Sequence, residues 1–372
     1  MGMNWAASGR RDDYSFHLVD PVSLTETGET VDVVEGGTIT FATSADNRIT
    51  ASLGLHNAST DRMIRIKHTI TLPGGYQHGE TLATLFVDGE SAQAQYHHST
   101  RDVSLYSSLL RATADVCARD FARPAGTNIV GEIRDLLETD GGKLRVLQGV
   151  DTNRTHTVPV WWEVGTKRSK VLDDLAMWTG CEYGVDEDGY ITWGKYIDPI
   201  NRPLAYVFED GENCVYKSGY QLDYGADDAY NRVVAHFARQ SKQDDPSKEN
   251  YDLYPLSDSV YVDLPATHPH SYERMGRRKA YDLKVSDPCD HASLTAMAQR
   301  KLDEVSSSDP ILVIEHVSVP GLREGNLVQY INSTDPQMVP LYSVYAIVEE
   351  IQMELGRGCM CKTKLRLSLI HI

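Results

Sequence analysis

The sequence predicts an α+β fold, mainly β, in which two β regions carry two small α/β insertions. Apolar and polar residues alternate through most of the chain, which is typical of half-buried strands. The period changes to 3.6 residues in three short stretches, which predicts three helices. Hydrophobic residues make up 41% of the 372 residues and charged residues 24%, as in an ordinary folded protein. A chain of this length is longer than the roughly 250–300 residues that fold around a single hydrophobic core, so several domains are expected.

The first β domain is assigned to residues 1–125. Its strands are predicted by alternating segments at Val31 to Phe41, Arg62 to Leu72 and Thr81 to Val87. The pair Asp88-Gly89 follows the last of these segments and predicts a turn. The stretch from Arg123 to Gly126 contains proline and glycine and ends the region.

A small α/β insertion, residues 126–203, is predicted next. Its first helix rests on four apolar residues spaced i, i+4, i+7 and i+8: Ile129, Ile133, Leu136 and Leu137. We expect this helix to end at Gly141-Gly142. A second helix is expected from Lys170 to Gly180, with Ser169 as its N-cap and the glycine as its stop.

The acidic stretch EYGVDEDGY begins at residue 182 and invites comparison with a calcium loop of the EF-hand type. If Gly189 is position 6 of such a loop, Asp186 and Asp188 fall correctly at positions 3 and 5. Positions 1 and 12 would then be Gly184 and Lys195, which supply no side-chain carboxylate. The calcium motif therefore fails at both ends.

A β-hairpin explains the same stretch better. A three-residue loop, Glu187 to Gly189, would pair Tyr183 with Trp193, and the glycine would supply the positive φ that the loop requires. Four large apolar side chains then share one face: Tyr183, Val185, Ile191 and Trp193.

The second β domain is assigned to residues 204–239 and 306–372, with a second insertion, residues 240–305, between its two parts. Strands are expected at Leu204 to Phe208 and Asn231 to Phe237, followed by a polar loop from Gln240 to Asp252. A third helix is predicted by apolar residues at helical spacing: Leu294, Met297, Ala298, Leu302 and Val305. Strands resume at 311–319, 327–331, 341–355 and 361–369.

The last two strands have a predictable register. With a turn at Gly356 to Gly358, Gln352 faces Lys362 and Glu350 faces Lys364. The opposite face of this hairpin is then apolar or uncharged: Ile351, Met353, Leu355, Cys361, Thr363 and Leu365. A shift of one residue would place charges against apolar side chains, so this register is favoured.

A search for chemistry finds no GxSxG, HExxH, GxxxxGK[ST] or GxGxxG motif in a suitable context. We therefore predict no catalytic, cofactor-binding or metal-binding residues. The pairs His97-His98 and His268/His270 have no carboxylate or cysteine at ligand spacing. Cys359 and Cys361 would face the same side of a strand. We expect both to be free thiols, and metal binding is the alternative.

Net charge is −17 and is spread along the chain, which argues against gripping nucleic acid through phosphate contacts. The N-terminus has no apolar signal region, and no apolar run approaches the roughly 20 residues that cross a bilayer. Neither secretion by that route nor membrane insertion is expected.

The order of several motifs resembles the hub proteins at the tips of phage tails, in the minor-tail-protein form of long-tailed phages and prophages. The resemblance extends from about residue 14 to 369 and rests on the order of segments, each of which is degenerate by itself. These segments are Asp20-Pro21, the helix 170–180 followed by 182–199, YNRVV at 230, RMGRR at 274, the helix that ends at Leu302, and EGNLV at 324.

The resemblance implies two β-barrel-like tube domains in each chain and a homotrimeric ring that continues the tail tube. DNA would pass through the lumen without specific binding. The implied partners are the distal tail ring, the tape measure, and tip or fibre proteins. The implied location is the virion, after synthesis in the bacterial cytoplasm, with no cofactor and no enzymatic activity.

Two other functions compete with this one. One is a carbohydrate- or receptor-binding tail module with an aromatic platform made of Trp161, Trp162, Trp178 and Trp193. The adjacent pair Trp161-Trp162 is also compatible with one ring in the core and one at the surface. The other, less favoured, is a cell-wall hydrolase, for which the sequence has no motif.

Overall fold

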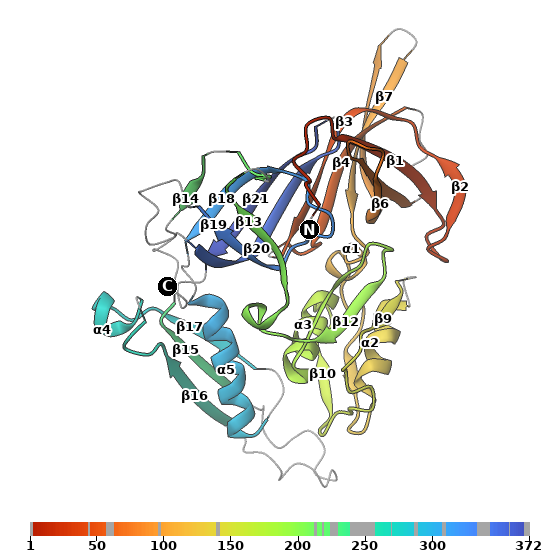
Figure 1. Ribbon diagram of the computed structural model, residues 1–372. Helices are drawn as coiled ribbons and strands as arrows, with labels where there is room; N and C mark the ends of the chain where they lie inside the picture. Colours follow the sequence, from red (N-terminus) through yellow and green to blue (C-terminus); the bar gives the residue numbers. More distant parts are fainter. Residues whose placement is uncertain are drawn as a thin grey trace.

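The computed structural model has an α+β, mainly β architecture, as predicted (Figure 1). It describes residues 3–43, 45–56, 63–95, 98–138, 142–211, 214–217, 219–223, 230–238, 257–268, 270–285, 289–306, 310–332, 343–356 and 358–367. The predicted loop from Gln240 to Asp252, and His97, lie outside these residues. In the described part of the chain, no helix combines the length and apolar character that a bilayer crossing requires.

One 13-stranded sheet contains strands of both predicted β regions. From the first region come β1 (Arg11–Val19), β2 (Glu26–Thr30), β3 (Val33–Ala42), β4 (Ile49–His56), β5 (Met63–Thr71), β6 (Gln77–Gln95) and β7 (His98–Tyr106). From the second come β13 (Leu204–Glu209), β14 (Gln221–Asp223), β18 (Ile311–Val317), β19 (Leu327–Ile331), β20 (Ser343–Glu354) and β21 (Met360–Leu367).

The two β regions are joined by backbone hydrogen bonds, because β3 pairs antiparallel with β20. The strand order is β14-β18-β21-β20-β3-β4-β7-β6-β5-β1-β2, with β19 also paired to β20 and β13 paired to β19. Among the described strands this path ends at β2 and β14 and closes no barrel. The division of the chain into two tube domains remains a prediction, as does the structural likeness of the two β regions.

The predicted turn at Asp88-Gly89 was wrong. Strand β6 continues through both residues to Gln95, and its pairing with β7 shifts register between Val87 and Glu90. A β-bulge accommodates such a residue pair as readily as a turn does, since glycine relieves the local backbone strain. The β6–β7 hairpin consequently projects beyond the rest of the sheet (Figure 1).

The first insertion contains both predicted helices, but it begins before the predicted residue 126. Leu109 and Ala112 are part of its core, and residues 121–123 pair with residues 160–162. Its elements are α1 (Leu110–Thr113), β8 (Phe121–Arg123), α2 (Ile129–Glu138), β9 (Leu144–Val146), β10 (Val160–Trp162), α3 (Arg168–Thr179), β11 (Cys181–Val185), β12 (Ile191–Lys195) and the 3-10 turn η1 (Pro199–Asn201). Gly180 ends α3 at φ +66°, as predicted. Ser169 is not the N-cap, because α3 begins one residue earlier. The Arg168 N–H donates to the carbonyl of Asp115, a partner that is remote in sequence.

The hairpin of β11 and β12 has the predicted register, with Tyr183 opposite Trp193. Its acidic loop docks on the large sheet. The Thr84 hydroxyl donates to the Glu187 carbonyl at 2.8 Å, and the Ser108 hydroxyl donates to the Gly189 carbonyl at 2.6 Å. This loop is therefore the contact that seats the first insertion on the sheet.

The second insertion contains a strand that the sequence analysis placed elsewhere. Strand β15 (Arg232–Ala238) pairs with β16 (Ser257–Asp263) and β17 (Ala280–Lys284), not with the large sheet. The buried side chains of β15 pack on those of the predicted third helix, α5 (His291–Val305). The strand contributes Val233, Ala235 and Phe237, and the helix contributes Leu294, Ala298 and Leu302. Alternation identifies a half-buried strand, but it does not identify the sheet that the strand joins. A short helix, α4 (Tyr272–Met275), precedes β17.

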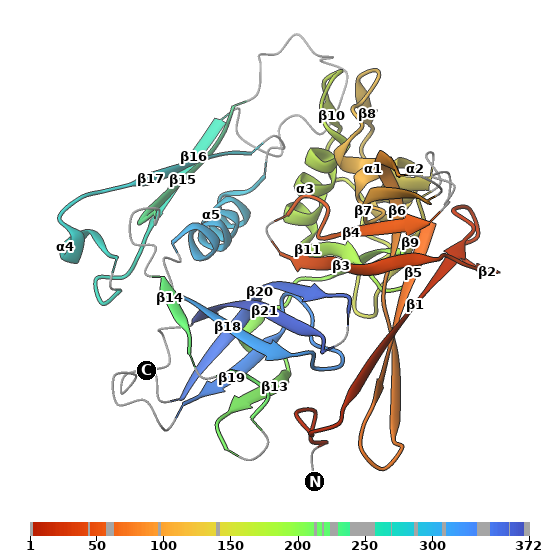
Figure 2. The ribbon, with the colours of Figure 1, turned by 90° about the horizontal axis from the view of Figure 1, so that it is seen from above.

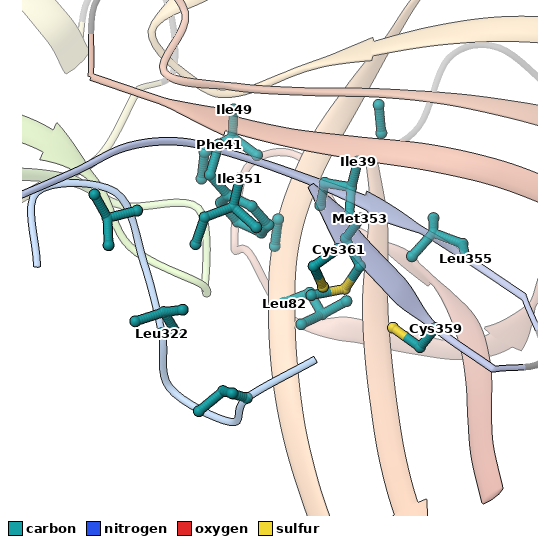
Figure 3. Packing of buried hydrophobic residues seen from close by; sticks show 14 of the residues in the cluster. Ile39, Phe41, Ile49, Leu82, Leu322, Ile351, Met353, Leu355, Cys359 and Cys361 are labelled. Atoms are coloured by element: carbon teal, nitrogen blue, oxygen red, sulfur yellow. The ribbon is translucent and has the colours of Figure 1, made fainter. Parts of the chain in front are cut away.

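The predicted C-terminal hairpin is confirmed in register: Gln352 faces Lys362 and Glu350 faces Lys364. Its other face lies in the main core, where residues of β3, β4 and β6 meet the hairpin (Figure 3). The labelled residues of this packing include Ile39, Phe41, Ile351, Met353 and Cys361.

The docking loop gives a first prediction, for Gly189→Ala. The glycine has φ +91°, and an added Cβ would lie 3.3 Å from Cβ of Thr84. Gly74 has the same φ and no atom within 4 Å of an added Cβ, so Gly74→Ala is the matched control. Both changes carry the cost of left-handed backbone, about 1–2 kcal/mol. We expect Gly189→Ala to lower the free energy of unfolding by about 1 kcal/mol more in denaturant titrations. Equal losses would show that the loop does not depend on this contact.

Candidate interaction surface

The outward side of the large sheet is a polar surface that crosses both β regions. We call it the polar face and define it by the outward residues of β18, β21, β20, β3, β4 and β7. One row across these strands follows directly from the register: Glu315, Lys362, Gln352, Thr40, Thr50 and Tyr106. A neighbouring row contains Glu354, Thr38, Ser52 and Ser104. The face is therefore rich in hydroxyl groups and continuous across the β3–β20 junction.

Opposite charges are paired on the polar face. Lys364 donates to Glu350 at 2.9 Å, Arg366 to Glu349 at 2.8 Å, and Lys217 to Glu315 at 2.7 Å. Exposed pairs of this kind contribute only about 0–1 kcal/mol each to stability. Their consequence is electrostatic, because Lys364 and Arg366 on β21 each have a carboxylate within contact, which lowers the positive potential that a polyanion would meet there.

Two hollows of the described structure, of about 170 and 250 Å³, lie at β1 and along β5 and β6. Neither is lined by residues of the rows across the polar face. A surface of paired charges and hydroxyl groups suits contact with another macromolecule more than capture of a small ligand.

This fold is the fold of solved phage tail proteins, as the resemblance in sequence implied. A tail protein from Neisseria meningitidis MC58 aligns with a TM-score of 0.66 and 12% identity over 95% of this chain and 96% of that one. The 43 kDa tail protein of prophage MuSo2 from Shewanella oneidensis aligns with a TM-score of 0.60 and 11% identity over 95% and 97%. At such identities the alignments establish the fold.

A third similar structure is prophage tail protein gp18 from Listeria monocytogenes EGD-e, with a TM-score of 0.53 and 9% identity over 96% of this chain and 97% of that one. The VgrG complex of Francisella aligns at a TM-score of 0.56 and 8% identity, where this chain covers 53% of the matched one. No protein-family model and no curated protein matches the sequence.

The predicted aromatic platform does not form. Trp162 and Trp193 are buried, and Trp178 stacks on Trp162 with ring centroids 5.5 Å apart. Trp161 is 54% exposed, so the adjacent pair divides between core and surface, as the second interpretation of the sequence predicted. The exposed face of four tryptophans that a sugar-binding module would need is absent.

Of the two histidine pairs, His268 and His270 lie 5.7 Å apart between ring centroids. Burial, together with the neighbouring His270, lowers the pKa of His268. All six cysteines are free thiols, and Cys359 and Cys361 are both buried. The acidic loop of the first insertion is engaged as a turn, because Asp186 accepts from the backbone N–H groups of Asp188 and Tyr190. The absence of a calcium ion there remains a prediction.

The sequence analysis missed one group of residues, which we call the buried polar cluster: Asp12, His68 and Cys359. Their side chains are all buried, and their potential ligand atoms lie within 4.8 Å of one another. The sequence of β5 contained one indication of this cluster. His68 alternates in step with Ile64, Ile66 and Ile70, which places it on the buried side of the strand. The sequence could not indicate that β1, β5 and the start of β21 meet.

The cluster is strongly polarised. Burial opposes the charged form of His68, but the hydrogen bond to Asp12 and the nearby carboxylate of Glu80 raise the pKa of this histidine to about 9. The pKa of Cys359 is lowered to about 7, chiefly by the hydrogen bond from Cys361 and also by Tyr14. The pKa of the Tyr14 phenol is raised by burial and by Cys359. Positive and negative groups are thus held close together in the interior.

The division of the tryptophan pair gives a second prediction. Trp162 packs in the core of the insertion, and its indole N–H donates to Asp174 at 2.9 Å. We expect Trp162→Ala to lower the free energy of unfolding by about 3–5 kcal/mol. The control Trp161→Ala removes an exposed ring of the same type and should change it by no more than about 0.5 kcal/mol. Thermal melts of both variants provide the comparison, and a large effect of Trp161→Ala would contradict this assignment.

Proposed function

We propose that this chain is a structural subunit of a phage or prophage tail tip. The observation that carries the proposal is the agreement of the fold with tail proteins over at least 95% of this chain at TM-scores of 0.66 and 0.60. Whole-chain agreement matters because it includes both insertions as well as the large sheet. The subunit would act in the virion, after synthesis in the host cytoplasm.

The finer part of the proposal is a homotrimeric ring that continues the tail tube as a hub. Each chain contributes two β regions joined at β3–β20, so three chains would supply six β regions around one axis. Closed rings arise when copies of a chain associate head to tail with a rotation that closes. The distal tail ring, the tape measure, and tip or fibre proteins would bind above, within and below this ring.

The polar face is the surface that we place toward the lumen. DNA carries closely spaced phosphates, and free cations on a channel wall would hold it in place. Carboxylates on β20 compensate Lys364 and Arg366 of this face. Hydroxyl-bearing threonines and serines occupy the rows on β3, β4 and β7. Such a wall favours passage of DNA without specific binding.

We propose no enzymatic role. Among the described residues of the two rows on the polar face, no hydroxyl group is hydrogen-bonded to a histidine or carboxylate. Asp12 and His68, which line the two hollows, are bonded to each other in the interior. Attachment to carbohydrate is not favoured either, since three of the four tryptophans of the proposed platform pack against other rings or in the core. Assays for cell-wall cleavage and glycan binding should both be negative.

The trimer is tested by the mass of the purified chain in solution. Multi-angle light scattering at increasing concentration should give three times the chain mass of 41.5 kDa. The full chain is used, because both insertions are part of the fold that the tail proteins share. A mass of one chain throughout the range would contradict self-assembly into a hub and would leave the fold assignment intact.

The lumen assignment is tested by DNA binding. At physiological salt the wild-type protein should bind double-stranded DNA no more tightly than about 1 mM, weaker than ordinary non-specific binding. The double change Glu350→Gln with Glu354→Gln removes two carboxylates from the polar face, one of them the partner of Lys364, and should strengthen binding severalfold. The control pair Glu138→Gln with Glu163→Gln makes the same change of charge on the first insertion and should not. Micromolar wild-type affinity with a steep salt dependence would overturn the assignment.

A further inference from the structure

We propose that the buried polar cluster of Asp12, His68 and Cys359 is a binding site for a thiophilic divalent cation, with zinc as the best fit. This inference is independent of the tail-tip function. It revises the expectation from sequence that the chain has no metal-binding residues. The three residues come from β1, β5 and the turn before β21, so the ion would join segments distant in the chain.

The donor set has the chemistry and the spacing of a zinc site. It offers one carboxylate oxygen, one imidazole nitrogen and one sulfur, and these atoms all lie within 4.8 Å of one another. Zinc binds such ligands at about 2.0–2.3 Å, so an ion between them requires only small side-chain movements. Three protein ligands leave one further coordination position, as in zinc sites that also hold a water molecule.

The surroundings of the three donors match the outer shell of a metal site. Nε2 of His68 lies 2.8 Å from Asp12, and Nδ1 lies 3.5 Å from a carboxylate oxygen of Glu80. Metal-bound histidines usually direct their second nitrogen to a carboxylate in this way. The Nδ1 atom has no hydrogen-bond partner within normal distance among the described residues, which leaves the orientation of this ring incompletely explained by the protein alone.

The other two donors are also held in place. The guanidinium of Arg10 donates to both carboxylate oxygens of Asp12, at 2.6 to 3.1 Å. The phenol of Tyr14 donates to Sγ of Cys359 at 2.5 Å. Donors fixed by a second layer of hydrogen bonds are preorganised, so binding would cost little conformational entropy.

The charge balance permits a divalent ion in this interior. A zinc ion brings two positive charges, and binding requires neutral imidazole and thiolate. The Asp12 carboxylate and a Cys359 thiolate together carry two negative charges, and the neutral imidazole of His68 carries none. The ligand set therefore balances the charge of the ion and adds no unpaired charge to the core.

Two hollows border the buried polar cluster. The one of about 170 Å³ is lined in part by Asp12 and Tyr14, and the one of about 250 Å³ in part by His68 and Glu80. Two of the three donor residues therefore line a space beside the site, where an ion could approach.

The test uses cobalt(II) as a spectroscopic substitute for zinc, with the full chain in metal-free buffer. The wild-type protein should bind one cobalt per chain and develop a thiolate-to-cobalt charge-transfer band, and zinc should displace the cobalt and raise the melting temperature. Cys359→Ser should remove the charge-transfer band. Cys181→Ser changes another buried free cysteine and should leave the band unchanged.

Glu80→Gln provides a readout that does not depend on losing a ligand. This change keeps the shape of the side chain but weakens the partner of His68 Nδ1, so cobalt affinity should fall by roughly 10- to 100-fold with the band retained. A wild-type protein with no charge-transfer band and no zinc-dependent melting temperature would overturn the proposal. So would a band that persists in Cys359→Ser. Either result would identify the cluster as an ion network held by protons alone.

Discussion

The pairing of β3 with β20 is the interaction on which the architecture depends. It joins strands more than 300 residues apart through five residue pairs, from Glu350 opposite Ala42 to Glu354 opposite Thr38. On its inner side, Ile39, Phe41, Ile351 and Met353 are buried in one core, and each such side chain contributes about 1.5–3 kcal/mol. The same register places polar residues on the outer side. One set of backbone bonds thus creates both the shared core and the continuous polar face.

A constraint on β3 accompanies this junction. Gly37 has φ +144°, and an added Cβ would lie 2.8 Å from Leu53 and 2.9 Å from the carbonyl of Ser52. The register of β3 against β4 shifts between Val33 and Gly37. Glycine therefore allows β3 to bend while its neighbours stay close on both sides. The backbone N–H of Leu355 donates to the carbonyl of Gly37, so the bend and the end of β20 are coupled.

The sequence predicted local structure well where a single segment contains its own evidence. The C-terminal hairpin was predictable because a shift of one residue would bury Lys362 and Lys364, and the β11–β12 hairpin because its aromatic residues align. Properties that depend on partners distant in the sequence could not be predicted. The start of α3 is fixed by Asp115 rather than by Ser169, and β15 joins the sheet that α5 covers. Alternation shows that one side of a strand is buried, but many partners can bury it.

The buried polar cluster belongs to the class of features that sequence reasoning cannot reach. Tyr14 on β1 touches Cys359 before β21, although seven strand pairings separate β1 from β21 along the sheet. The sheet must therefore curve until its two regions face each other (Figure 2). Side chains make contacts between the two regions at this place. Arg10 also donates to the carbonyl of Ser318, and Glu80 accepts from the N–H of Gly321.

Charged groups in this position are costly to bury, and they stabilise the fold only when every partner is in place. Hydrophobic packing alone would tolerate small changes in how the two regions face each other. The directional contacts of Arg10, Asp12, His68 and Glu80 define one arrangement. Arg10 and Glu80 also contact residues 318 and 321 of the second region, so the cluster and its partners hold the two regions at one angle. We therefore interpret the cluster as the element that fixes the curvature that the β3–β20 junction makes possible.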